Sequence, residues 1–254
     1  MICSKGDYVQ SVLGLNLIDS CSVGRELWSE IQCVDISNLG IDENSYSKLP
    51  LGKFNEYIFG ELLKASDRYE VKEQNLQFVR NRVTVGEIDF LLFDKVKQEF
   101  IHLELATKLY LKKEGIWVGP NLRDNLNLKR EKFTNQIKTL QELWGNLEIK
   151  YNHPIKHVNL ILGHQWENAN SNKISNYCYF PYSESFLDKL KQDDFVWSLP
   201  QKKDWLVDEK ILMNVLGFHN EIEPIKEVLE LNRSPLVIFK NEEEVFKCFI
   251  TFWE

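Results

Sequence analysis

The sequence predicts a mixed α/β fold in which helices flank a mixed β-sheet. Apolar side chains alternate along residues 83–93 and again along residues 99–111, the pattern of two half-buried strands. Apolar side chains at helical spacing mark residues 51–65 and residues 126–144. Because these helices and strands are interleaved along the chain, we expect them to form one α+β core. The length of 254 residues allows one large domain or two small ones.

The expected elements divide the chain into three parts. Residues 1–50 form a helical N-terminal lead-in, residues 51–164 form a core, and residues 165–254 form an aromatic-rich C-terminal extension packed on that core. The core has the order helix, three antiparallel strands, helix and strand. In chain order, the expected elements are helices at 25–31 and 51–65, strands at 75–79, 83–93 and 99–111, a helix at 126–144, a strand at 157–163, helices at 207–218 and 221–232, and a β-hairpin of 235–239 with 244–253.

Three local features refine this plan. Asn81 and Arg82 predict the turn before the second strand, and Gly145 is expected to end the long helix. The apolar stripe of that helix is Leu126, Phe133, Ile137, Leu140 and Trp144. The aromatic side chains of residues 164–205 are either core and interface or a surface on which bases stack, and we favour core and interface.

The composition is that of an ordinary globular protein, since 43% of the 254 residues are hydrophobic and 27% are charged. The net charge of −7 argues against a protein that coats nucleic acid without specificity. A local excess of basic residues follows the third strand, because residues 112–138 hold seven basic against three acidic side chains. The basic ones are Lys112, Lys113, Arg123, Lys129, Arg130, Lys132 and Lys138.

The five cysteines and the first residues indicate a cellular compartment. The cysteines are scattered and have no spacing typical of zinc ligands or of a disulfide framework. The start of the chain lacks the basic and apolar regions of a signal peptide, and no apolar run is long enough to cross a membrane. We therefore expect a cytoplasmic protein without membrane segments, and the oligomeric state stays open.

Residues 86–111 carry the candidate chemistry. The polar break at residues 94–98 predicts a chain reversal, and a loop centred between residues 96 and 97 places Asp89 opposite Glu104. The same register pairs Asp94 with Glu99 and Phe93 with Phe100. Directly opposed carboxylates repel, so the pair needs a cation or a shared proton. Lys108 follows Glu104 by an even step and points to the same face.

Other side chains flank this pair. Glu56, on the helix at 51–65, either faces solvent or leans over the sheet. Lys129, Lys132 and Gln136 form one polar stripe on the next helix, which either faces solvent or lines a groove. In a purely structural interpretation, Glu104 and Lys108 form a surface ion pair and Asp89 is solvated.

Two resemblances rest on these segments. The stretches GEIDFLLFD, HLELATKLYL and VGPNLRDNLNLKREKF resemble signature segments of a bacterial family named domain of unknown function 1853. The element order, with Asp89 and Glu104 on the second and third strands, resembles the PD-(D/E)XK nuclease superfamily and implies a restriction-endonuclease-like core. That resemblance implies a metal site of Asp89, Glu104 and Glu56, and Gln136 resembles a glutamine of some branches.

The resemblance also sets the functional expectation. It implies a nuclease dependent on Mg²⁺ or Mn²⁺ that acts on DNA or RNA, with Asp89, Glu104 and Lys108 as catalytic residues. The residues expected to contact nucleic acid are Asn121, Arg123, Lys129, Lys132 and Gln136. The chain departs from the pattern at Ala106, where a lysine is usual, and Lys108 stands two residues further on. The alternative is a catalytically inactive module that binds nucleic acid or a protein partner.

Overall fold

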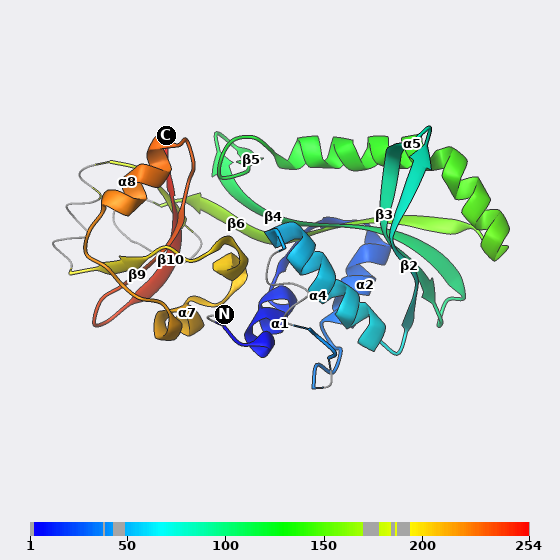
Figure 1. Cartoon of the computed structure of the whole chain (residues 1–254), viewed down its shortest axis with the longest axis horizontal. Helices are drawn as coiled ribbons and strands as arrows, with labels where there is room; N and C mark the ends of the chain where they lie inside the picture. The colour runs from blue at the N-terminus through cyan, green and yellow to red at the C-terminus, as the bar shows by residue number, and fades with distance from the viewer. Residues whose placement is uncertain are drawn as a thin grey trace. The chain divides into compact units, whose positions relative to one another are not determined.

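The structure is a computed structural model that describes residues 3–37, 39–42, 49–169, 178–183, 186 and 194–253; for residue 80 and residues 139–149 it describes the backbone alone. These residues include ten strands and six α-helices, which confirms the mixed α/β fold (Figure 1). The chain forms two compact units. We call residues 15–108 with 127–163 the core unit, and residues 1–14, 109–126 and 164–254 the terminal unit.

The core unit is built on a three-stranded antiparallel meander. Strand β2 pairs with β3 and β3 pairs with β4, and β6 lies beside β4 with β1 on its other edge. The contacts between β4 and β6 join residues 55 positions apart, as for His102 and His157, which makes these two strands parallel. The elements are β1 (Asn16–Ser20), α2 (Ser22–Ile31), α4 (Leu51–Ala65), β2 (Tyr69–Arg80), β3 (Val83–Asp94), β4 (Glu99–Lys113), α5 (Leu126–Tyr151) and β6 (Ile155–Asn168).

Much of this unit confirms the sequence predictions. The order of helix, three strands, helix and strand is present, and α4 has the expected bounds. The β3–β4 ladder pairs Asp94 with Glu99 and Phe93 with Phe100, which is the expected register. The turn between β2 and β3 falls at Asn81, as expected.

Other expectations were wrong in their bounds. Helix α5 continues through Gly145 to Tyr151, because a glycine inside a helix costs only about 1 kcal/mol and does not by itself end it. Strand β1 was not predicted, and β2 begins at Tyr69 rather than residue 75. Within the stripe expected on α5, Leu126 and Phe133 are buried. The side chains of Leu140 and Trp144 lie outside the described part of the helix.

Helices cover both faces of the meander. On one face, the ring of Phe59 from α4 lies 6.1 Å from that of Phe90 in β3. On the opposite face, Phe100 of β4 packs 4.6 Å from Tyr151 at the end of α5. Gly60 lets α4 lie close to the sheet, since a Cβ there would stand 3.2 Å from the Phe90 ring. The site described below is therefore built on a rigid, packed sheet.

The terminal unit contains the expected C-terminal hairpin, in which β9 and β10 pair antiparallel. Strand β7 lies parallel to β10. The large side chains Trp166 and Trp197 are buried, as a core position requires, whereas Phe180, Tyr182 and Trp205 are only partly buried. The elements are α1 (Lys5–Leu13), β5 (Ile116–Val118), β7 (Cys178–Pro181), β8 (Val196–Ser198), α7 (Glu209–Val215), α8 (Glu223–Glu230), β9 (Leu236–Lys240) and β10 (Val245–Thr251), with a 3-10 helix at Lys202–Leu206.

Within the described ranges, no helix combines the length and the apolar character needed to cross a bilayer.

Candidate metal centre

The β3–β4 ladder ends at the predicted carboxylate pair. Its last backbone pair is Phe90 with Leu103, so the next pair in register is Asp89 and Glu104. At this pair a side chain replaces the backbone as the hydrogen-bond acceptor between the strands. Oδ2 of Asp89 accepts a hydrogen bond from the backbone N–H of Leu105 at 2.8 Å. This bond fixes the Asp89 carboxylate at the point where the two strands part.

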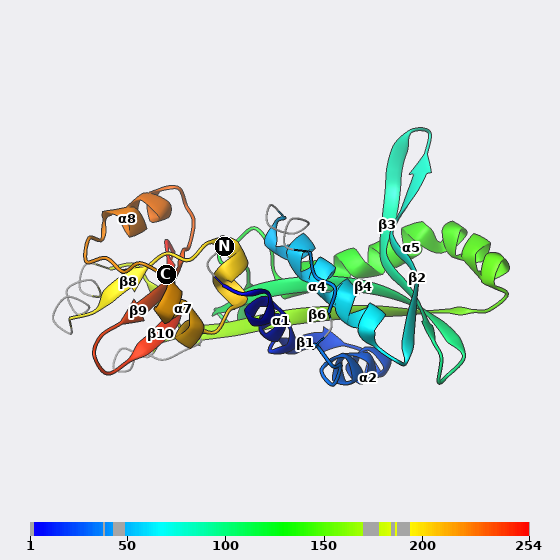
Figure 2. The ribbon, with the colours of Figure 1, turned by 60° about the horizontal axis from the view of Figure 1, so that its bottom comes forward.

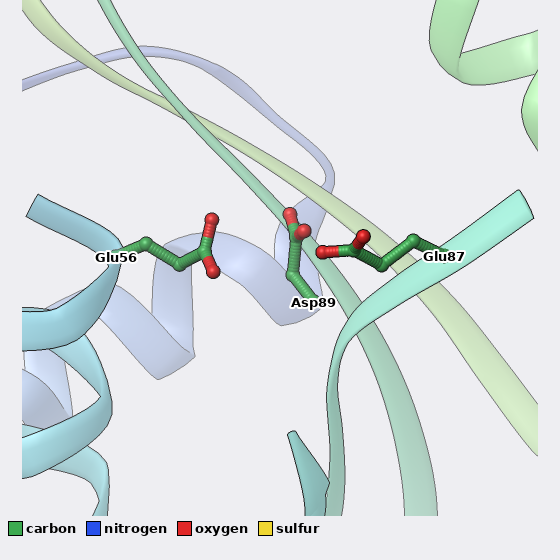
Figure 3. A group of neighbouring side chains, drawn as sticks. All are labelled: Glu56, Glu87 and Asp89. Carbon is green, nitrogen blue, oxygen red and sulfur yellow. The ribbon is translucent and has the colours of Figure 1, made fainter. Parts of the chain in front are cut away.

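Asp89 belongs to an acidic cluster that we define as Glu56, Glu87 and Asp89. One carboxylate oxygen from each residue lies within 4.8 Å of the others. Figure 3 shows Glu56 reaching from α4 and Glu87 from β3, with both carboxylates directed toward Asp89. Glu56 is buried on α4, as is its neighbour Asn55, so this carboxylate lies over the sheet rather than in solvent.

Two further side chains hold the acidic cluster together. The ammonium group of Lys53 lies 3.0 Å from Oε1 of Glu56 and 2.9 Å from Oε1 of Glu87. Burial acts to lower the pKa of Lys53, but the hydrogen bonds to the two glutamates outweigh it and raise that pKa. With its amide nitrogen facing the carboxylates, Asn75 of β2 donates to Glu56 at 2.6 Å and to Glu87 at 3.1 Å.

Glu104 is held separately, on the side of α5. It is only 3% exposed, and its Oε2 accepts a hydrogen bond from Nε2 of Gln136 at 2.8 Å. The same Gln136 amide donates to the backbone carbonyl of Glu87 at 3.0 Å, which ties α5 to the acidic cluster. Oε1 of Glu104 lies 2.7 Å from Nε2 of His102, whose Nδ1 lies 3.2 Å from Nδ1 of His157.

The electrostatics set the two opposed carboxyl groups apart from ordinary acids. Burial, and then the negative charge of Glu104, raise the pKa of Asp89 to about 7. Burial likewise raises the pKa of Glu104 to about 7, although the charge of Lys129 and the Gln136 hydrogen bond act in the opposite direction. Burial lowers the pKa of His102 to about 3, so this imidazole is neutral at physiological pH.

The metal centre brings together five of the residues singled out in the sequence, namely Glu56, Asp89, Glu104, Lys129 and Gln136.

The other sequence candidates lie elsewhere. Lys132 is exposed on α5, and Lys108 lies partly exposed on β4. Asn121 and Arg123 belong to the terminal unit, where the side-chain oxygen of Asn121 accepts a hydrogen bond from the backbone N–H of Ser234 at 3.0 Å.

Sequence reasoning missed three neighbours of the site. Glu87 lies two residues before Asp89 in β3, and Lys53 lies one helical turn before Glu56, so spacing alone would have placed both near the predicted acids. His102 also lies two residues before Glu104. The prediction considered only the opposed pair of Asp89 and Glu104, so it left out the residues two or three positions before each predicted acid.

The donor set suits a hard divalent cation. Three carboxylate groups converge, and Mg²⁺ and Mn²⁺ prefer oxygen ligands. Two Mg–O bonds of about 2.1 Å span up to about 4.2 Å, close to the spacing within the acidic cluster. The combined negative charge is offset by Lys53 from within, so a divalent cation would stabilise the ionised cluster further. The residues present therefore fit such an ion.

Fold and site together define a mixed α/β protein with an acidic cluster and a buried carboxyl pair at the end of a β-meander. The chain belongs to the family described as domain of unknown function (DUF1853), whose model matches residues 34–243. A search of curated proteins found no match to this chain. A search of solved structures likewise found none.

Proposed function

We propose that this protein is a nuclease-like phosphodiesterase that hydrolyses nucleic acid with the help of Mg²⁺ or Mn²⁺. The observation that supports it most is the position of Asp89, which joins the acidic cluster to the buried Glu104. The elements follow in the order α4, β2, β3, β4, α5 and β6, and the two opposed acids lie on β3 and β4. This arrangement supports a PD-(D/E)XK-like core in a bacterial protein. The five scattered cysteines, which lack the spacing of a disulfide framework, support a place in the reducing cytoplasm.

Glu56, Glu87 and Asp89 would hold the metal ion. When bound, such an ion polarises a phosphodiester and lowers the pKa of a coordinated water. Glu104 adjoins this group but keeps its own hydrogen bonds to Gln136 and His102. It is therefore positioned by the protein rather than by the ion.

The remaining polar side chains have separate tasks. With a pKa near 7, Glu104 can take up and release a proton at physiological pH, which is the property of a general base. Lys129 and the exposed Lys132 on α5 provide positive charge for the phosphates of a bound strand. Lys108 is the catalytic lysine by resemblance, whereas Lys53 is the lysine whose ammonium group already lies on the acidic cluster.

Calorimetric titration with Mg²⁺ and Mn²⁺ tests the metal site. We expect binding to the wild type and its loss in Asp89→Asn and Glu56→Gln. The matched control is Glu61→Gln, since Glu61 is also on α4 but pairs with Lys64. Absence of binding to the wild type would exclude the proposal, as would unchanged binding in Asp89→Asn.

Cleavage assays then test the reaction. Single-stranded, duplex and branched DNA and RNA are incubated with the wild type and with Asp89→Asn in the presence of each metal. We expect cleavage that depends on the metal and on Asp89. This assay also identifies the nucleic acid, and end-labelled substrates distinguish endonucleolytic from exonucleolytic cleavage.

A second candidate function is a catalytically inactive module that binds nucleic acid or a protein partner. Two observations favour it. Lys53 already neutralises part of the acidic cluster, and Ala106 stands where the superfamily pattern has a lysine. Metal binding together with nucleic-acid binding, but with every substrate left intact, would select this candidate.

A further inference from the structure

Strands β2 and β3 continue beyond the metal centre as a two-stranded arm, which we define as residues 75–86. Figure 2 shows this arm projecting from the core unit past helices α4 and α5. Its ladder runs from Leu76 opposite Ile88 to the turn, where Arg80 pairs with Val83. The arm begins beside Glu87, so it continues directly from the part of β3 that carries Glu87 and Asp89 of the acidic cluster.

The arm exposes apolar side chains on both of its faces. Val79 and Val83 are 62% and 63% exposed, and Val85 is 39% exposed. Val79 pairs with Thr84, one position away from the pair that contains Val83, so the two valines point to opposite faces. β-Branched side chains on a free ribbon lose solvent contact only when a partner surrounds the ribbon on both sides. A flat surface would cover one face alone.

The charge of the arm is opposite to that of the whole chain. Residues 75–86 contain Arg80 and Arg82 and no acidic residue, whereas the whole chain has a net charge of −7. The side chain of Arg82 is exposed at the turn. The arm therefore combines positive charge with apolar contact surface, and it fits a polyanion with a concave surface.

The turn gives the arm a defined shape. Asn81 and Arg82 both have positive φ, 51° and 64°, as a two-residue hairpin turn of type I′ requires. Such a turn matches the natural twist of the strands, so the tip continues the ribbon rather than ending in a loose loop.

We propose that the β2–β3 arm enters the major groove of duplex DNA and carries a phosphodiester toward the acidic cluster. This inference rests on the proposed nuclease function and adds how the substrate is held. The major groove of B-form DNA is about 12 Å wide and about 8.5 Å deep and admits a two-stranded ribbon. Val83 lies four positions before Glu87, roughly 13 Å along the strand. This is longer than the groove is deep, so a tip on the floor of the groove leaves the acidic cluster outside it, beside the phosphates.

The side chains of the arm match what the groove offers. Arginine at the tip can contact phosphates or the edge of guanine, and valine methyl groups can contact the methyl group of thymine. The major groove of an A-form RNA duplex is too narrow for side chains to read. The arm therefore selects B-form DNA over duplex RNA.

Fluorescence anisotropy with a labelled DNA duplex of about two helical turns tests the arm. The titration is performed in EDTA, so that binding is measured without cleavage. The arm variant is Arg82→Glu with Val83→Ser. The matched control, Lys95→Glu with Val96→Ser, makes the same types of change at the opposite end of β3, where Val96 is 72% exposed.

We expect the arm variant to weaken duplex binding about tenfold or more and to reduce the salt dependence of log K by about one phosphate contact. The control variant should bind like the wild type, and an RNA duplex should compete poorly. Equal affinities of arm and control variants would overturn the inference. Equal competition by duplex RNA would also overturn it, as would self-association of the wild type that the arm variant abolishes while neither binds DNA.

The test is separate from that of the metal centre. The arm variant should titrate Mg²⁺ like the wild type, because Arg82 and Val83 lie four or more residues from Glu87. Metal binding by the wild type, together with duplex binding that is the same in the arm variant as in the wild type, would overturn this inference alone. Arm-dependent DNA binding without metal binding would instead remove the nuclease function and leave the arm as a DNA-binding element.

Discussion

Replacing Asp89 with asparagine should stabilise the metal-free protein at alkaline pH. The folded state raises the pKa of Asp89 from 3.8 to about 7, first through burial and then through the charge of Glu104. The folded protein therefore holds this proton more tightly than the unfolded chain does. That advantage is present at low pH and is lost as the pH rises through about 7. Asparagine keeps an oxygen for the Leu105 N–H but carries no charge.

The size of the effect follows from the raised pKa. One pKa unit corresponds to about 1.4 kcal/mol, and roughly one and a half units separate pH 5.5 from the folded pKa. Titration of Asp89 between about pH 5.5 and pH 8.5 therefore removes about 2 kcal/mol from the free energy of unfolding. The wild type loses this amount, and Asp89→Asn does not. Relative to the wild type, the variant should gain about 2 kcal/mol over the same interval.

Urea unfolding followed by circular dichroism at the two pH values measures this difference. Asp94→Asn, on the same strand, is the opposite control. Burial acts to raise the pKa of Asp94, but hydrogen bonds from Arg68 and from two backbone N–H groups hold that pKa below its usual value. Asp94→Asn should therefore lower the free energy of unfolding by about 3 kcal/mol at both pH values. If the stability of Asp89→Asn depended on pH in the same way as that of the wild type, the raised pKa of Asp89 in the folded protein would be refuted.

Two further changes test other parts of the core unit. Gly163→Ala would place a Cβ 1.7 Å from the carbonyl oxygen of Lys108, at a φ of +152°. We therefore expect loss of soluble protein, or destabilisation by more than about 3 kcal/mol in urea unfolding. The control Gly52→Ala has open space around it and should be neutral or slightly stabilising. Lys53→Met leaves the acidic cluster without its lysine, so Mg²⁺ should raise the melting temperature more than in the wild type; a smaller rise would show that Lys53 does not compete with the ion.

Local patterns carried the parts of the fold that could be predicted. The bounds of α4 follow from Pro50 before the helix and from the polar residues after it. The β3–β4 register follows from apolar alternation on both strands, because a slip of one residue would reverse every side chain. Strand β1 has no such signal in NLIDS and forms because the edge of β6 is available to pair with it.

The site was predictable as residue types but not as an environment. The pair of Asp89 and Glu104 follows from the register. The depth of burial of Glu104 depends on Gln136 and His102, and Gln136 lies 32 positions away in the chain. Whether Glu56 and Glu87 lie close to Asp89 depends on the distance between α4 and β3, which side-chain packing sets. Sequence spacing cannot give such distances.

The histidine pair beside Glu104 has a directional consequence. When Glu104 is ionised, it accepts from Nε2–H of His102, so Nδ1 of His102 is an acceptor and His157 must donate from its own Nδ1. When Glu104 is protonated, the Gln136 amide occupies Oε2, the proton lies on Oε1, and both bonds of the chain reverse. The tautomer of His157 is thus a remote indicator of the charge on Glu104, and the nitrogen chemical shifts of His157 should change when metal binding changes that charge.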